Sequence, residues 1–158
     1  MAKRQGLNNK LIQAYRLAIY RVLTDPPFDL RIDHYSEALA DWHARVGVNY
    51  SALISAANPR SRQLDKTENQ RRHSELIHQL RNHPFAEGLN LDPSGQWPDE
   101  PSVLIGGISS KEAHALAEIW GQNAWLEADR KAIPRLTAQS ERAGYLKEAL
   151  SMSFRGRV

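Results

Sequence analysis

The spacing of hydrophobic residues predicts a helix and then a hairpin in the first part of the chain. Between residues 8 and 20, apolar side chains recur at the three- and four-residue intervals of one helix face. Residues 20–23 and 28–32 alternate apolar and polar positions, as strands do, and Pro26 excludes a helix between them. We therefore expect two strands joined by a turn.

Helix, strand and helix are predicted in turn through the middle of the chain. Ser36 is positioned to cap a helix that ends at Gly47. Residues 48–57 follow as a strand with apolar side chains on both faces, which indicates a covered place inside a sheet. Asp65 stands three residues before Glu68, the spacing of a capping box at the start of the next helix.

The inner face of the helix after Asp65 changes character along its length. Its stripe consists of Asn69, Arg72, His73, Leu76, Ile77 and Leu80. Because the far half is apolar and the near half polar, we expect the far end to be buried. The near end would then meet a polar surface or a ligand. This makes the strand, turn and helix of residues 53–80 the predicted functional surface.

The C-terminal half begins with a stretch that is predicted to be mostly loop. Residues 85–99 are divided by glycine and proline, so we expect them to be rich in loop, with a turn at residues 91–95 between short strands. Trp97 is expected to pack as a lid on the core. The other expected elements are a strand over residues 102–108, a helix from Ser109 or Ser110 to Trp120 ended by Gly121, and strands over residues 123–128 and 133–136.

Together these elements predict one α+β domain over residues 1–136. Its sheet is expected to be mixed, with about four to six strands and three to four helices packed on it. Residues 137–158 are predicted to be a C-terminal extension, either a short helix or partly disordered. The pattern determines neither the order of the strands nor the oligomeric state.

Composition removes several classes of protein and site. The chain has 158 residues, enough for one ordinary domain with a real core, and no cysteine, which excludes disulfides, thiolate catalysis and cysteine-bound metals. Its longest apolar runs are only a few residues, too short to span a bilayer. We therefore expect a cytoplasmic protein that does not enter the membrane.

Charge adds a weak indication of an anionic partner. The net charge is +3, no acid precedes Asp25, and residues 58–82 contain six basic and three acidic side chains. Such a surface attracts phosphate groups or nucleic acid. A solvated basic surface with no partner, or a surface that binds another protein, is the alternative.

Four short motifs follow one another along the chain. They are Ile54-Ser-Ala-Ala-Asn-Pro-Arg-Ser, Glu68-Asn-Gln-Arg-Arg, Trp97-Pro-Asp-Glu-Pro-Ser and Gly121-Gln-Asn-Ala, preceded by Gln13-Ala-Tyr and Tyr20-Arg-Val. As a set they resemble a bacterial family catalogued as domain of unknown function 3293, over roughly residues 13–136. Ser55 replaces the threonine usual in that family and keeps its hydroxyl group. The resemblance implies a shared fold and supplies no activity.

The candidate site combines polar residues from the predicted functional surface. We expect a small anionic ligand at the start of the Asp65 helix, where free backbone N–H groups favour negative charge. The residues expected to bind it are Asn58, Ser61, Asn69, Arg72 and Gln122. The alternative is structural: Asn58-Pro59 makes a turn, Asn69 satisfies backbone groups, and Arg72 pairs with Glu100 or another acid.

Catalysis is the second hypothesis for the same residues. It would be an enzyme acting on a phosphate-bearing or nucleotide substrate, and the sequence does not decide whether the protein is an enzyme. A triad of Ser61, His73 and Glu68 can be written down, although triads are recognised by geometry rather than by sequence. The histidines lack the spacing of a helical zinc pair, so no metal and no cofactor is predicted.

Overall fold

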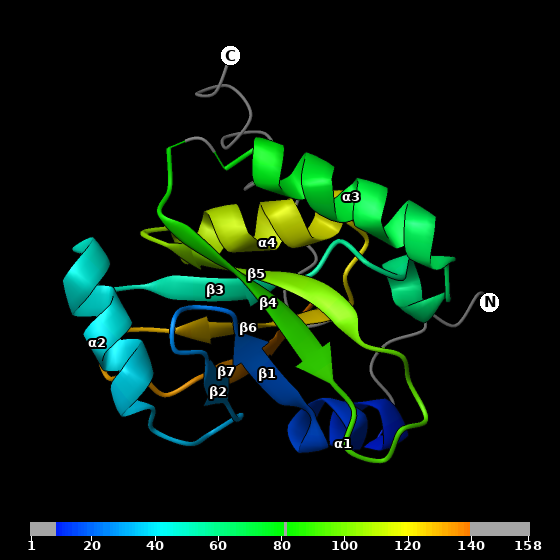
Figure 1. The fold of residues 1–158 in the computed structure, drawn as a ribbon, viewed down its shortest axis with the longest axis horizontal. Helices are drawn as coiled ribbons and strands as arrows, with labels where there is room; N and C mark the ends of the chain where they lie inside the picture. The colour runs from blue at the N-terminus through cyan, green and yellow to red at the C-terminus, as the bar shows by residue number, and fades with distance from the viewer. Residues whose placement is uncertain (1–8, 81, 140–158) are drawn as a thin grey trace.

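The computed structural model describes residues 9–80 and 82–139. Its elements are α1 (Asn9–Leu17), β1 (Ile19–Val22), β2 (Phe28–Leu30), α2 (Glu37–Val46), β3 (Ser51–Ile54), the 3-10 turn η1 (Pro59–Ser61), α3 (Lys66–His78), β4 (Phe85–Leu91), β5 (Glu100–Gly106), α4 (Ser110–Ile119), β6 (Ala124–Ala128) and β7 (Arg135–Ala138). Figure 1 shows them in space. No helix in this described part is both long and apolar enough to cross a membrane.

The strands form one curled sheet in the order β2-β1-β4-β5-β3-β6-β7. Every neighbouring pair is antiparallel. The α+β class is therefore confirmed, whereas the expected mixed sheet of four to six strands is wrong: the described residues form seven strands with no parallel neighbours.

The antiparallel pairing follows from how the helices cross the sheet. α3 connects β3 to β4, which are separated by β5, and α4 connects β5 to β6, which are separated by β3. Strands joined through a helix run parallel, but the strand inserted between them runs opposite to both. This is the split β-α-β-β-α-β arrangement of ferredoxin-like folds. β1 and β2 extend it at one edge and β7 at the other.

β4 is longer than the short strand that the sequence pattern predicts before the turn at residues 91–95. Residues 85–91, expected to be loop-rich, form a seven-residue strand inside the sheet. Gly88 in its middle reads as a breaker, but a Cβ there would lie 2.6 Å from the backbone oxygen of Arg21 and 2.8 Å from Oγ of Ser102. Glycine is needed because β1 and β5 approach this position closely.

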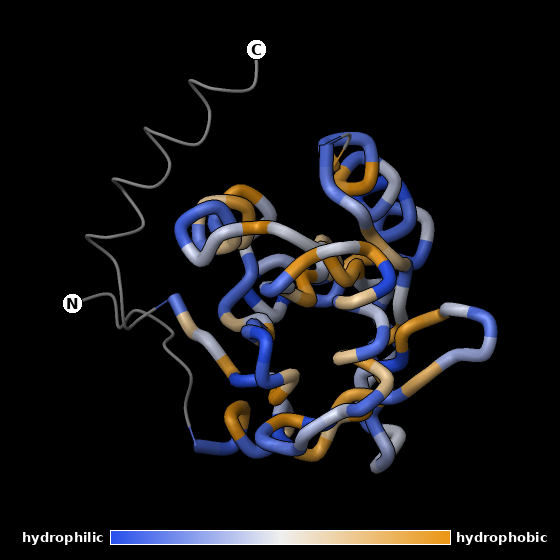
Figure 2. Tube along the Cα trace, turned by 90° about the vertical axis from the view of Figure 1, so that its left-hand side faces the viewer, coloured by the Kyte–Doolittle hydropathy of each residue, from blue (hydrophilic) through white to orange (hydrophobic). Residues whose placement is uncertain are grey.

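Two apolar clusters lie on opposite faces of the sheet. One contains Ile54 and Val103 beneath α3 and α4, and the other contains Leu53 and Leu104 on the opposite face, together with residues of β1, β2 and α2. Figure 1 shows α3 and α4 together on one side of the sheet, and Figure 2 shows the curl of the sheet around the other side. β3 is buried along its whole length, as its apolar pattern on both faces predicts.

Local signals locate the helix ends correctly. The side chains of Ser36, Asp65 and Ser109 each accept a hydrogen bond from a backbone N–H three residues further on, and Gly47 ends α2 with φ +76°. The stripe of α3 is buried or half-buried at every predicted position. Boundaries elsewhere shift slightly: β7 runs to Ala138, two residues past the expected domain end. The structure describes no residue after 139, so the short helix expected in the C-terminal extension lies outside the described residues.

Candidate functional site

The joint between η1 and α3 is built by two asparagines. Asn58 has a left-handed backbone with φ +48°, and its N–H donates to Oδ1 of Asn69 at 2.9 Å. Oδ1 of Asn58 accepts from Nδ2 of Asn69 at 2.8 Å and from the N–H of Leu64 at 2.9 Å. Asn69 therefore satisfies the turn rather than an incoming ligand, as the structural alternative predicts.

Arg72 is committed to the same joint. Its guanidinium donates to the carbonyl of Ala56 at 2.5 Å and to the carbonyl of Trp120 at 2.8 Å, and it lies 5.1 Å from the centre of the Trp120 ring. Burial lowers the pKa of Arg72. The guanidinium joins the ends of β3 and α4, and its partners are carbonyl groups rather than the acid expected from the sequence.

The start of α3 is also occupied by a protein group. The Asp65 carboxylate accepts from the N–H of Glu68 at 2.7 Å. A negative charge thus already lies where the sequence suggests an anion.

The remaining predicted residues face a cavity. Asn58, Ser61 and Gln122 line a hollow of about 100 Å³ between α1, the η1 turn and the loop from β4 to β5, which we call the α1 cavity. Gln122 donates to the carbonyls of Ala57 at 2.9 Å and of Trp120 at 3.1 Å, and Oγ of Ser61 accepts from Asn123 at 3.0 Å. The structure brings three of the five predicted residues to one cavity and leaves Asn69 and Arg72 behind its wall.

Backbone strain collects beside this cavity. Asn58, Arg60 and Ser61 all have positive φ, between +48° and +61°. Such conformations cost energy in residues other than glycine and occur preferentially at binding and catalytic sites. The turn is held against Gly121, whose carbonyl accepts from the N–H of Arg60 at 2.6 Å.

The deep wall of the α1 cavity is a row of polar side chains across three strands. Tyr20 on β1 faces Asn90 on β4, and Asn90 faces Glu100 on β5. Directly opposite residues project from the same face of a sheet, so the three side chains are neighbours. Among the described residues, the lining consists of Leu11, Ala14, Tyr15, Ala18, Tyr20, Asn58, Ser61, Gln63, Asn90, Leu91, Asp92, Trp97, Pro98, Glu100, Gln122 and Asn123.

Two groups in this row are unusual. Burial raises the pKa of Glu100, and the hydrogen bond from Nδ2 of Asn58 at 3.0 Å opposes this only in part. Oδ1 of Asn90 is buried and has no hydrogen-bond partner in the described structure. A buried acceptor without a partner costs stability, which a ligand or a water molecule would restore.

Tyr15 and Tyr20 complete the polar part of the cavity. Burial, followed by the negative charge of Glu100, raises the pKa of Tyr15 to about 12, against a hydrogen bond with Ser61. Tyr20 donates its hydroxyl to the carbonyl of Tyr15 at 2.7 Å and so ties β1 to α1. Both side chains therefore stay protonated near neutral pH.

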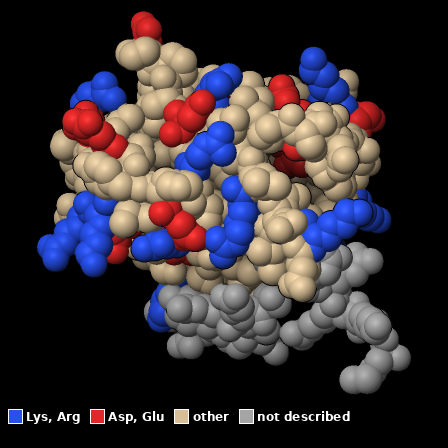
Figure 3. Space-filling view, turned by 90° about the horizontal axis from the view of Figure 1, so that it is seen from below, with Lys and Arg blue, Asp and Glu red and all other residues tan. Residues whose placement is uncertain are grey.

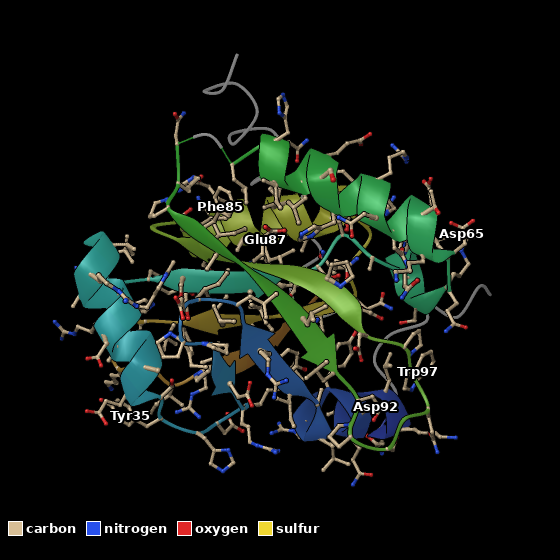
Figure 4. All side chains as sticks on the ribbon, in the orientation of Figure 1. Tyr35, Asp65, Phe85, Glu87, Asp92 and Trp97 are labelled. Atoms are coloured by element: carbon tan, nitrogen blue, oxygen red, sulfur yellow. The ribbon has the colours of Figure 1, made fainter. Side chains whose placement is uncertain are left out.

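Trp97 lies at the mouth of the cavity rather than over the core. Its side chain is 44% exposed, so the expected lid on the core is wrong. The Asp92 carboxylate accepts from the N–H groups of Ser94, Gln96 and Trp97 and shapes the loop. Figure 4 shows Asp92 and Trp97 on this loop beside α1.

The sequence therefore did not point to Asn90, Trp97 and Glu100 as residues of the α1 cavity. Glu100 and Trp97 stand inside one of the family-like motifs, and a charged residue at the start of an apolar strand was an available signal. Asn90 had no signal, because it lies in a loop-rich stretch where only a short strand before the turn was expected.

The triad considered from the sequence does not assemble. Ser61 contacts Asn123, His73 contacts Glu87 at 2.8 Å, and Glu68 pairs with Arg71. Within residues 9–80 and 82–139, no group of three or more His, Cys, Asp or Glu side chains is placed to hold a metal ion.

Charge around the α1 cavity does not have the sign expected from composition. Among the residues that the structure describes, its lining contains Asp92 and Glu100 but no lysine or arginine. Figure 3 shows Lys and Arg interspersed with Asp and Glu on the face seen from below. A single basic patch is not visible on that face.

These features define an α+β domain with an antiparallel curled sheet and a small, partly apolar cavity against its N-terminal helix. Residues 54–125 match the model of the family described as Protein of unknown function (DUF3293), so this segment of the chain is similar to that family. The matched segment runs from the end of β3 into β6 and includes Asn90, Trp97 and Glu100. Searches of curated proteins and of solved structures found no match.

Proposed function

We propose that the α1 cavity binds a small ligand that combines a hydrogen-bond donor, neutral or cationic, with an apolar body. The supporting observation is the buried Oδ1 of Asn90, which lacks a partner in the described structure and lies beside the Glu100 carboxyl. Both groups accept hydrogen bonds, so a donor on the ligand would satisfy them.

Two of the hydrogen-bond donors that line the cavity are already paired, which also favours a ligand that donates. Nδ2 of Asn58 already contacts Glu100, and Nε2 of Gln122 already contacts two carbonyl groups. An anionic ligand, predicted from the basic residues of the sequence, would meet a carboxyl group without a described cation in the lining. Buried charge without a partner is strongly disfavoured, so we favour an amine, amide or alcohol.

The walls supply the apolar part of the site. Leu11, Leu91 and Pro98 line the cavity, and the exposed ring of Trp97 stands at its mouth. The volume of about 100 Å³ is less than the roughly 150 Å³ that encloses benzene in a protein core. The polar end of a ligand would therefore enter while its body rests against Trp97.

Catalysis in the same cavity is the second candidate. A half-buried carboxyl with a raised pKa is a typical general acid or base, and the strained turn beside it is a common feature of active sites. The phosphate-bearing or nucleotide substrate predicted from the sequence has less support, because the described lining offers no cation. Turnover that disappears in Glu100→Gln while binding persists would favour this candidate.

A matched set of probes tests the proposed function. Benzylamine, benzyl alcohol and benzoate share a ring and differ in the polar end, and their binding is measured by calorimetry. We expect benzylamine to bind at least about tenfold more tightly than benzoate, because only the amine pairs with Glu100. Glu100→Gln should remove most of that preference, and Trp97→Ala should weaken all three probes.

A control variant separates the site from general effects. Glu37→Gln removes an exposed carboxyl group in the first turn of α2, far from the cavity lining, and should leave the preference unchanged. If benzoate binds as tightly as benzylamine, the proposal is contradicted and the anionic ligand expected from the sequence is favoured instead. If none of the three probes binds, the proposal is also contradicted, and the cavity is a gap in the packing rather than a binding site.

A further inference from the structure

A second cavity lies at the opposite end of the sheet. It has a volume of about 300 Å³ and is lined by Tyr50, Ser110, His114, Glu127, Asp129, Lys131, Ile133, Arg135 and Thr137. We call it the Glu127 cavity. It opens where α4 begins, because α4 packs on β3 and β6 while β7 lies beyond them at the edge of the sheet. Within the described residues, it shares no lining side chain with the α1 cavity.

The floor of this cavity is a fixed carboxyl group. Glu127 is only 6% exposed and accepts hydrogen bonds from the Tyr50 hydroxyl and, at 2.8 Å, from Nε1 of Trp125. Nδ1 of His114 lies 3.8 Å from its Oε2 atom, and the rings of His114 and Trp125 meet edge to face at 4.8 Å. Burial and the contact with Glu127 raise the pKa of Tyr50, so its hydroxyl remains a donor.

The Glu127 carboxyl group can accept further hydrogen bonds. Each oxygen of a carboxylate has two lone-pair sites, and each oxygen of Glu127 has one donor in the contacts above. Within the described chain, neither lysine nor arginine pairs with Glu127. A buried carboxylate that has donors but no strong counter-charge favours a cationic group placed against it.

The rim of the cavity has cationic side chains. Lys131 and Arg135 are exposed at the mouth, and Arg135 stands directly opposite Glu127 across the pairing of β6 with β7. One guanidinium nitrogen of Arg135 contacts Asp33 at 2.8 Å. The Asp129 side chain turns back to accept from the N–H of Lys131 at 2.8 Å. Glu127 thus places negative charge deep in the cavity, and the exposed rim combines the positive Lys131 and Arg135 with the Asp129 carboxylate.

We propose that the Glu127 cavity is a second binding site that takes a small zwitterion, with its ammonium group against Glu127 and its carboxylate between Lys131 and Arg135. The opposed charges would orient such a molecule and disfavour ligands that carry one charge only. The volume lies at the lower limit of small-molecule sites, which suits a molecule of amino-acid size. This site is independent of the function proposed for the α1 cavity.

The test uses a series of ω-amino acids from glycine to 6-aminohexanoate, each compared with the alkylamine and the alkanoate of the same chain length. Calorimetry on the full chain should find one chain length whose zwitterion binds at least about tenfold more tightly than either singly charged analogue. Glu127→Gln should reduce the zwitterion to the affinity of the alkanoate. Lys131→Gln combined with Arg135→Gln should reduce it to the affinity of the alkylamine.

Two further measurements keep the result interpretable. The rim variants are exposed and should keep the far-ultraviolet circular dichroism of the wild type, so they remain informative if Glu127→Gln does not fold. Glu118→Gln, on the same helix as His114 but outside the cavity lining, should leave binding unchanged. The proposal is overturned if the alkanoates bind as tightly as the zwitterions, or if no member of the series binds.

Discussion

The joint of α3 and the α1 cavity use the same kinds of polar residue and differ in how those residues are satisfied. At the joint, Asn69 forms hydrogen bonds with Asn58, and Arg72 donates to two backbone carbonyl groups. In the cavity, the buried oxygen of Asn90 has no partner in the described structure, and burial raises the pKa of Glu100. The paired groups of the joint are therefore structural, and the unpaired oxygen of Asn90 is what makes the α1 cavity the candidate binding site.

The largest effect is expected from Arg72→Ala. The change leaves the carbonyls of Ala56 and Trp120 without their donor and removes the contact with the Trp120 ring. We expect the free energy of unfolding to fall by about 2–4 kcal/mol. Urea denaturation measures it. The neighbouring Arg71→Ala, which breaks only exposed ion pairs on α3, is the matched control and should cost far less. Equal losses in the two variants would show that Arg72 is not part of the joint.

An intermediate effect is expected from Glu100→Gln, and it depends on pH. Because the folded pKa of Glu100 lies above its unfolded value, the folded state binds more protons between the two values and loses stability as pH rises through them. Glutamine keeps the acceptor for Asn58 without a charge. The variant should melt at a similar temperature to the wild type in acid and a few degrees higher near neutral pH.

The measured quantity is the difference between the two melting curves, since other acids change stability in the opposite direction. Burial raises the pKa of Glu100, whereas hydrogen bonds from Arg21 and Arg135 lower the pKa of Asp29 and Asp33. Those groups contribute equally to both proteins and cancel. A difference that is constant from acid to neutral pH would contradict the assigned burial of Glu100.

The smallest effect on stability is expected from Asn90→Leu. Its buried oxygen has no partner to lose among the described residues, and leucine fills part of an existing cavity. We expect a change within about 1 kcal/mol, together with weaker binding of benzylamine. Asn69→Leu is the same substitution at a fully paired asparagine and should cost about 2–3 kcal/mol in thermal or urea unfolding. If the two substitutions cost the same, the contrast between the joint and the cavity is wrong.

Much of the fold was predictable because the signals were local. The caps at Ser36, Asp65 and Ser109 depend on side chains within one turn of the helix that they start, and the stripe of α3 depends on its own periodicity. The full length of β4 was not predicted because Gly88, a breaker in isolation, is required by two neighbouring strands that are distant in sequence. The predicted division between residues 136 and 137 stays a prediction, although β7 continues to Ala138.

The candidate site was predictable only in part for the same reason. Asn58, Ser61 and Gln122 reach the α1 cavity from the motifs that pointed to them, but their partners Tyr20, Asn90 and Glu100 meet across three strands. The Glu127 cavity joins Tyr50, which precedes β3, to residues from α4, β6, β7 and the loop between the last two strands, and it had no signal in the sequence.

By itself, the sequence determined the class of the domain, the caps of its helices, the buried strand β3 and the polar joint after it, because each depends on residues that are close along the chain. Only the tertiary structure decided that all neighbouring strands are antiparallel, which polar groups are paired, and where acids gather. These outcomes depend on which strands become neighbours. Burial and pairing among distant residues then set the charge and the free hydrogen-bonding capacity of each cavity.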